Sequence, residues 1–185
     1  EAGNFEVHED GILQTENFEV TPPQDTNCIR PADIVFIIDN SGSMGGEIND
    51  VRNNAIAFGD SLDALGIDYR LGAIRFGQSA SSGNTQYFGP LTDDINQFQS
   101  WIQSMYASGG IERGLQSIID AIGYFSFRPG SSRHIVLITD EDSDGGSLAT
   151  AISLCNTNNI TVHVHVDCGF GSSYYHYCGP DAIGQ

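Results

Sequence analysis

Short apolar runs alternate along the chain with segments in which apolar residues recur every three or four positions. Residues 34–38 form a continuous apolar run between Asp33 and Asp39, which is typical of a strand buried on both faces. The apolar residues that follow are spaced like one face of a helix, and Gly66 stands where a left-handed cap commonly ends a helix. The apolar positions of this predicted helix are Ile48, Val51, Ala55, Phe58, Leu62 and Leu65.

The same alternation continues through the rest of the sequence. The remaining predicted strands are residues 69–76, 86–88, 134–139 and 160–166, and the remaining helices lie around 95–105, 115–122 and 147–156. Strands that alternate with helices indicate a mostly parallel sheet covered on both faces. We therefore predict an α/β, Rossmann-like fold, with a mostly parallel central sheet, helices on both faces and one short antiparallel edge strand.

The first 31 residues follow a different pattern from the rest. Apolar residues lie on both sides of an acidic turn at residues 9–11, and the pair Pro22-Pro23 then stops any regular element. We predict a β-hairpin followed by a linker over residues 1–31, and one domain over residues 32–185. The sequence begins without a signal-peptide pattern, as expected of a mature chain or of a piece of a longer protein.

Length and charge limit the possible partners. The 185 residues suffice for one domain with a sizeable core and rarely for two. Acidic residues number 24 and basic residues 7, all of them arginine, so the net charge is −17. A surface this negative repels nucleic acid and anionic membranes, which excludes both as expected partners. No apolar run approaches the roughly 18 residues of a spanning helix, so we expect no membrane insertion.

The four cysteines, Cys28, Cys155, Cys168 and Cys178, include no C-x-x-C pair, so a zinc ribbon or a thioredoxin motif has no support. An even number of cysteines in an acidic chain without lysine fits an oxidising compartment, and we expect at least one disulfide. A bond between Cys168 and Cys178 would tie down the stretch rich in Gly, Ser and Tyr between them, and the other two could then pair. The connectivity stays open, and four reduced thiols are the alternative.

The candidate chemistry lies in the segment Asp39-Asn40-Ser41-Gly42-Ser43, where the first buried strand ends and a helix begins. In an open parallel sheet, ligands bind at the carboxyl ends of the strands. A carboxylate followed at alternate positions by two hydroxyls can bring three oxygens around one point, and hard cations such as Mg²⁺ prefer oxygen ligands. Helix capping is the alternative explanation, but a cap needs one such residue rather than three. We predict a divalent cation site.

This segment resembles the metal ion-dependent adhesion site of the von Willebrand factor A (integrin I-like) domain, whose signature is Asp-x-Ser-x-Ser after an apolar strand. The order of the elements and the triplet Ile138-Thr139-Asp140 are similar to the family as well, and the resemblance covers roughly residues 32–185. It implies that Asp39, Ser41 and Ser43 ligate the ion. It also implies that Asp140 lies near the ion, often through a water molecule.

One expected ligand is missing from this sequence. The family usually supplies a threonine from the loop before the third helix, but residues 107–114 contain none. Glu112 is the best replacement and Ser108 the second, although an acid here is also explained by the favourable field at a helix N-terminus. If Glu112 ligates, the ion is more fully neutralised, and Ca²⁺ or Mn²⁺ becomes as plausible as Mg²⁺.

The resemblance to this family also suggests a second interpretation of the N-terminal segment. Its domains normally continue past a segment like residues 178–185 into a Gly-Gly turn and a final edge strand. Residues 2–7 look like that turn and strand, so Phe5 and Val7 could lie in a sixth strand by circular permutation, which neighbouring termini make tolerable. The alternative is a separate hairpin outside the sheet.

The resemblance implies a non-catalytic binding or adhesion module, extracellular or at a cell surface, within a larger multidomain protein. It would recognise an acidic residue of a protein partner through the bound ion. The alternatives are a structural module with a purely stabilising ion and, less favoured, a Mg²⁺-dependent phosphohydrolase with Asp39 as nucleophile. The latter needs a second nearby carboxylate and a cation for phosphate, whereas Asn40 and Ser41 follow.

Two histidines suggest another possible metal site. His163 and His165 alternate with valine in the last predicted strand, so they point to the same face. Imidazole is a common metal ligand. Packed or surface histidines are the commoner explanation of such a pair.

Overall fold

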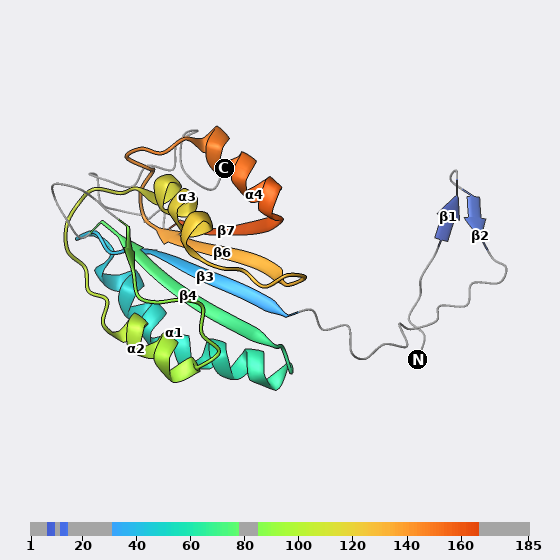
Figure 1. Ribbon diagram of the computed structural model, residues 1–185, viewed down its shortest axis with the longest axis horizontal. Coiled ribbons are helices and arrows are strands. Elements are labelled where there is room, and N and C mark those ends of the chain that lie inside the picture. Colours follow the sequence, from blue (N-terminus) through green and yellow to red (C-terminus); the bar gives the residue numbers. More distant parts are fainter. Residues whose placement is uncertain (1–6, 10–11, 15–30, 78–84, 167–185) are drawn as a thin grey trace.

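The computed structural model describes residues 7–9, 12–14, 31–77 and 85–166 (Figure 1). Its strands are β1 (Val7–Glu9), β2 (Ile12–Gln14), β3 (Ala32–Asp39), β4 (Tyr69–Phe76), β5 (Gln86–Tyr87), β6 (Ser132–Thr139) and β7 (Ile160–Val166). Its helices are α1 (Gly45–Ala64), α2 (Ile95–Gln103), α3 (Gly114–Tyr124) and α4 (Leu148–Asn158).

Five strands form the central sheet in the order β5-β4-β3-β6-β7. β4, β3, β6 and β7 are parallel, whereas the short edge strand β5 pairs antiparallel with β4. Helices α1 and α2 cover one face and α3 and α4 the other (Figure 1). The predicted Rossmann-like α/β fold is therefore confirmed, including its antiparallel edge strand.

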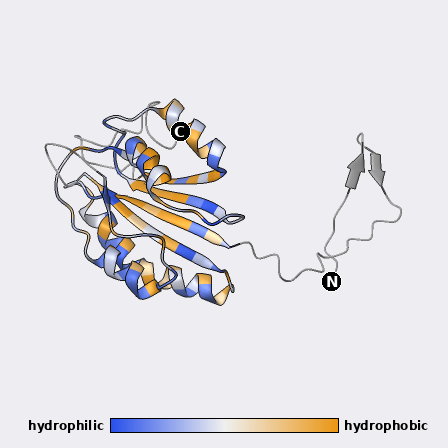
Figure 2. Ribbon diagram, in the orientation of Figure 1, coloured by the Kyte–Doolittle hydropathy of each residue, from blue (hydrophilic) through white to orange (hydrophobic). Residues whose placement is uncertain are grey.

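The side chains of β3 alternate between two hydrophobic cores. Ile34 and Ile38 belong to the core under α1 and α2, and Val35 and Ile37 to the core under α3 and α4. Figure 2 shows hydrophobic residues along the central strands and on the helices beside them. Because both faces of β3 are buried, its sequence is a continuous apolar run rather than an alternating one.

Local signals set the helix ends. Gly66 has a φ of +65°, and the Gly66 and Ile67 N–H groups donate to carbonyl oxygens of the last turn of α1 at 2.9 and 3.1 Å, which is a Schellman cap. The prediction was wrong for Leu65, which follows the last residue of α1 and is 66% exposed instead of packed in the core. At the start of α2, the Asp94 carboxylate accepts hydrogen bonds from two N–H groups of the first turn, which makes it the N-cap of that helix.

The hairpin formed by β1 and β2 is a two-stranded antiparallel sheet of its own. Contribution of the N-terminal segment to a sixth strand stays a prediction.

Cys155 is a buried free thiol, so the suggested pairing of Cys28 with Cys155 is not observed. Cys28, Cys168 and Cys178 lie outside the described residues, where the Cys168–Cys178 bond stays a prediction. Within the described ranges, each helix is too short or too polar to cross a membrane.

Arginines hold the amino end of β3. Asp33 is fully buried, and its carboxylate accepts hydrogen bonds from the Arg70 Nε and Nη2 atoms at 3.1 and 2.8 Å. The Nε and the main-chain N–H of Arg128 donate to the same carboxylate at 2.8 and 2.6 Å. Burial raises the pKa of Asp33, but the hydrogen bonds from both arginines outweigh it and the pKa lies below the usual value. Asp33 is therefore an ionised anchor joining β3, β4 and the loop before β6.

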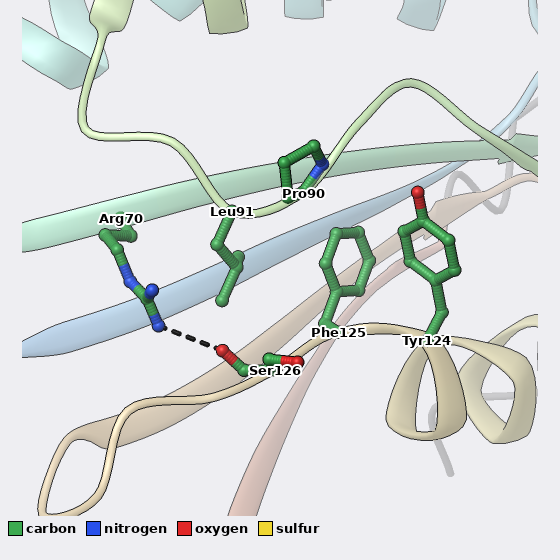
Figure 3. Close-up of a pocket in the computed structure, with 6 residues that line it drawn as sticks. All are labelled: Arg70, Pro90, Leu91, Tyr124, Phe125 and Ser126. Carbon is green, nitrogen blue, oxygen red and sulfur yellow. Dashed lines mark hydrogen bonds between the residues drawn. The ribbon is translucent and has the colours of Figure 1, made fainter.

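A pocket of about 250 Å³ lies beside this anchor. Figure 3 shows its lining residues, with Arg70 donating from Nη2 to the Ser126 carbonyl oxygen at 3.0 Å along one wall. Leu91 and Phe125 supply an apolar wall. Because Arg70 lies near the amino end of β4, this pocket is remote from the carboxyl ends of the strands, where the predicted ion site lies.

Candidate metal centre

Main-chain hydrogen bonds fix the loop that follows β3. The Asn40 N–H donates to the Phe76 carbonyl oxygen at 2.8 Å, which holds the loop against the end of β4. The Ser108 N–H donates to the Asn40 carbonyl oxygen at 2.7 Å, and the Gly42 N–H donates to the Gly109 carbonyl oxygen at 3.1 Å. The loop after β3 and the loop before α3 are therefore held together at the carboxyl edge of the sheet.

The side chains of Asp39, Ser41 and Ser43 meet within this loop. Asp39 is fully buried, and its Oδ1 accepts a hydrogen bond from the Ser41 N–H at 2.8 Å. Its Oδ2 accepts a hydrogen bond from the Thr139 hydroxyl at 2.8 Å. The Ser41 and Ser43 hydroxyl oxygens lie 3.1 Å apart. The structure thus brings together the three residues of the Asp-x-Ser-x-Ser motif, and Thr139 fixes the carboxylate orientation.

Gly77 allows this close packing at the end of β4. Its φ is +95°, a conformation that side chains other than hydrogen rarely permit. A Cβ atom at this position would lie 2.9 Å from both the Asp39 Oδ1 and the Ser41 nitrogen. Only glycine therefore lets the chain pass this close to the motif.

Glu112 and Asp140, the two candidate ligands that lie farther along the chain, are also buried. Glu112 is 6% exposed and Asp140 is 2% exposed. The Glu112 N–H donates to an Asp144 carboxylate oxygen at 3.0 Å, and the Asp144 N–H donates to the Glu112 carbonyl oxygen. Ser108, the second candidate to replace the missing threonine, is half-buried and engages the motif loop through its main chain.

Negative charge accumulates around these side chains. Burial raises the pKa of Asp39 to about 6, against the hydrogen bonds from Ser41 and Thr139, and the charge of Asp140 adds to the rise. Burial, then the charges of Glu141 and Asp39, raise the pKa of Glu112 to about 8. The pKa of Glu141 is raised in the same way, first by burial and then by Asp140.

The carboxylate cluster, which we define as Asp39, Glu112, Asp140 and Glu141, has no basic partner among the residues that the structure describes. In the described part of the chain, none of its members forms an ion pair. The Asp140 Oδ1 atom is buried and has no hydrogen-bond partner there. Burying a polar oxygen without a partner is costly, so this atom fits a site that would hold a cation.

The donor set suits a hard divalent cation. Carboxylate and hydroxyl oxygens are the ligands that Mg²⁺, Ca²⁺ and Mn²⁺ prefer. Among residues 31–77 and 85–166, and in the described hairpin, no group of three or more His, Cys, Asp or Glu side chains is arranged to hold a metal ion. An ion at this edge would therefore depend on the Ser41 and Ser43 hydroxyls together with the carboxylates. The ligand roles of all five candidates stay a prediction.

Sequence reasoning missed several residues that build the site. Thr139 belongs to the triplet that supported the family resemblance, but its hydrogen bond to Asp39 had not been expected. Asp144 could have been noticed, because Asp140, Asp142 and Asp144 alternate directly after a buried strand. Gly77 has no side chain to signal its role, and its contact with the motif depends on the pairing of β3 with β4.

Comparisons with known proteins agree with this architecture. A family model described as the von Willebrand factor type A domain matches residues 33–173. The chain is 29% identical over 169 residues to the collagen alpha-1(XX) chain of Mus musculus, covering 83% of this chain and 11% of that protein. It is 25% identical over 124 residues to inter-alpha-trypsin inhibitor heavy chain H3 of Mesocricetus auratus, covering 64% of this chain and 14% of that protein. The chain thus spans a small part of the curated relatives it matches.

Solved structures from bacteria share the fold. The conserved hypothetical protein BatB from Bacteroides thetaiotaomicron has a TM-score of 0.58 and 21% identity, over 72% of this chain and 65% of that chain. An aerotolerance-related membrane protein from Bacteroides fragilis has a TM-score of 0.59 and 21% identity, over 79% of this chain and 76% of that chain. At this level of identity, the likeness concerns the fold alone.

Proposed function

The chain belongs to the von Willebrand factor type A domain family, and on that premise we propose that it is a non-catalytic, metal-dependent protein-binding module. Domains of this family commonly serve in adhesion and protein binding. Asp39, Ser41 and Ser43 would hold a divalent cation, with Glu112 and Asp140 beside it. An acidic residue of a protein partner would complete the coordination of the ion.

The observation that carries this proposal is the buried, unpartnered Asp140 Oδ1 within a cluster of carboxylates that has no protein counter-charge in the described residues. Such a cluster is destabilising by itself, since the charge of Asp140 adds to the rise of the Asp39 pKa, and the charges of Glu141 and Asp39 add to the rise of the Glu112 pKa. A divalent cation would relieve this repulsion and provide Asp140 with a partner, directly or through water. A purely structural cap at the start of α1 would require neither Asp140 nor Glu112.

Each residue of the site has a distinct part in binding. The Ser41 N–H and the Thr139 hydroxyl orient Asp39, and the Asn40 side-chain amide donates to the Tyr106 carbonyl oxygen at 3.0 Å. These contacts fix the ligands before the ion arrives, which reduces the entropy lost on binding. When bound, the cation supplies a positively charged centre that accepts a carboxylate oxygen from a partner. Mg²⁺ fits the motif, and Ca²⁺ or Mn²⁺ fits equally if Glu112 ligates.

The setting of the module is part of the same proposal. Similarity to a collagen chain and to an inhibitor heavy chain, of which this chain spans 11% and 14%, supports a place within a larger multidomain protein outside the cell or at its surface. The net charge of −17 opposes nucleic acid as a partner. A protein ligand with an acidic contact residue is the partner class that the site chemistry favours.

Titration with Mg²⁺, Mn²⁺ and Ca²⁺ tests the site directly. We expect calorimetry to show one ion bound with a stoichiometry near one, and Asp39→Ala to abolish binding. Asp50→Ala, which removes an exposed carboxylate from α1, is the matched control and should bind as wild type does. Equal uptake of all three ions by wild type and Asp39→Ala would refute the site assignment.

A second measurement separates recognition from mere stabilisation. Water-proton relaxation of the Mn²⁺-loaded protein reports the water molecules on the ion, and a short glutamate-containing peptide serves as the probe for an acidic partner. We expect added peptide to displace one bound water molecule, and an otherwise identical glutamine-containing peptide to leave it in place. Unchanged relaxation with both peptides would indicate an ion that only stabilises the loops.

A further inference from the structure

Two imidazole rings from neighbouring strands meet on the sheet. His134 of β6 pairs in register with Thr161 of β7, and His163 pairs with Val136, so the two histidines are diagonal neighbours on one face. The His134 Nδ1 and His163 Nε2 atoms lie 3.1 Å apart, and the ring planes are inclined by 31°. His163 and His165 are exposed in the described structure, and His134 is half-buried.

We propose that His134 and His163 together bind a divalent transition metal ion that prefers imidazole ligands, such as Zn²⁺. Zinc–nitrogen bonds of about 2.0–2.1 Å at a tetrahedral angle place two ligand nitrogens about 3.4 Å apart. The observed separation of 3.1 Å is therefore within a few tenths of an ångström of that geometry. To admit the ion, both rings must turn so that their lone pairs point at the ion and not at each other.

Metal binding replaces the proton that the two rings share. In the metal-free pair, one of the two facing nitrogens carries a proton and donates a hydrogen bond to the other nitrogen. A metal needs the lone pairs of both nitrogens, so the donating ring must move its proton to its other nitrogen, and both rings stay neutral. Burial, and then the charge of His163, lower the pKa of His134, which favours the neutral ring that coordination needs.

This site differs in chemistry from the proposed cation site at the end of β3. Nitrogen ligands select Zn²⁺, Cu²⁺ or Ni²⁺, whereas the carboxylates and hydroxyls near Asp39 select Mg²⁺ or Ca²⁺. The described residues offer no group of three or more His, Cys, Asp or Glu side chains for a metal, so water would fill the remaining positions. The ion would also join β6 to β7, the last strand of the described sheet, and would stabilise that edge on binding.

The test is Zn²⁺ titration of the full chain with Mg²⁺ kept at saturation, so that the oxygen-lined site stays occupied. Zinc binding should raise the melting temperature of wild type. We expect His134→Gln and His163→Gln each to need a zinc concentration about tenfold higher or more for the same rise. His165→Gln is the matched control, because it changes a histidine two positions away on the same strand and face. It should respond to zinc as wild type does.

Nitrogen NMR of the imidazole rings identifies the ligating atoms and does not depend on stability. We expect Zn²⁺ to shift the Nδ1 resonance of His134 and the Nε2 resonance of His163, and to leave the ring of His165 unchanged. The proposal is overturned if neither His134 nor His163 shifts, if His165→Gln loses as much affinity as His163→Gln, or if both pair variants bind zinc as wild type does.

Discussion

The two ends of β3 treat a buried aspartate in opposite ways. Asp33 and Asp39 are both fully buried on the same strand. At the amino end, Arg70 and Arg128 neutralise Asp33 and hold its pKa below the usual value. At the carboxyl end, Asp39 has other carboxylates for neighbours and its pKa rises to about 6. The protein itself supplies the positive charge at one end, and at the other we expect it to come from solution.

The largest effect is expected from removing an arginine at the amino end. Arg128→Ala deletes the ion pairs of 2.8 Å to Asp33 and 2.6 Å to Asp68, and leaves a buried carboxylate short of donors. Breaking a buried pair typically costs about 3–5 kcal/mol, and we expect this loss of unfolding free energy in denaturant titration, with or without Mg²⁺. Arg52→Ala on α1 is the control. A loss that Mg²⁺ restores would contradict the contrast between the two ends.

The next effect is a pH dependence of opposite sign at the two ends, measured in chelator. Because the pKa of Asp39 rises from 3.8 to about 6 on folding, its stabilising contribution is present at low pH and is lost as the pH rises through 6. Glu112, with a pKa of about 8, extends the loss to higher pH. We expect the metal-free unfolding free energy to fall between about pH 4 and pH 8 by at least the roughly 3 kcal/mol that corresponds to the shift of Asp39 alone, with Glu112 adding to the loss.

The contribution of Asp33 has the reverse sign, since its folded pKa is lowered, and it is lost only as the pH falls through that lowered value. Saturating Mg²⁺ should flatten the loss between acid and neutral pH, because a bound cation favours ionised carboxylates. Identical pH profiles with chelator and with Mg²⁺ would show that the cluster near Asp39 does not hold the ion.

Added Mg²⁺ should stabilise the protein only through the carboxyl end of β3, where Asp39 lies. With Mg²⁺ at about 100 times its dissociation constant, we expect the unfolding free energy to rise by about 2.7 kcal/mol in wild type. Asp39→Ala should show no gain, whereas Arg128→Ala should show the full gain on its lower baseline. Differential scanning calorimetry at several Mg²⁺ concentrations measures both, and an equal gain in Asp39→Ala would place the ion elsewhere.

The smallest effect is expected at Gly77. Gly77→Ala introduces a Cβ atom 2.9 Å from the Asp39 carboxylate and the Ser41 nitrogen at a φ of +95°, and such strain costs about 1–3 kcal/mol. We expect weaker Mg²⁺ binding together with this loss. Gly110→Ala is the control, because nothing lies within 4 Å of the new methyl group. Unchanged Mg²⁺ affinity in Gly77→Ala would show that β4 does not support the site.

The sequence predicted those parts of the molecule in which neighbours along the chain determine the outcome. The continuous apolar run before Asp39 predicted a buried central strand, and the predicted strand at residues 160–166 coincides with β7. The alternation of Asp39, Ser41 and Ser43 predicted oxygen atoms that meet in one loop. Leu65 was assigned to the core because spacing alone does not show that the helix ends one residue earlier.

Contacts between distant segments could not be predicted in this way. Asp33 meets Arg128 across 95 positions, and His134 meets His163 across 29. Each of these contacts depends on the order and register of the strands in the sheet. The local sequence pattern does not show which distant strand becomes a neighbour. The unpartnered oxygen of Asp140 is likewise visible only after the fold has buried it.

The Glu112 main chain makes two hydrogen bonds with Asp144, one to its carboxylate and one from its N–H, and they have a consequence for changing the module. The Glu112 peptide group, through its N–H and carbonyl oxygen, joins the loop before α3 to the loop after β6. These two bonds use main-chain atoms of Glu112, so neither of them requires a carboxylate at this position. We therefore expect that replacing this carboxylate with a hydroxyl leaves both loops in place and changes which ion the proposed site favours.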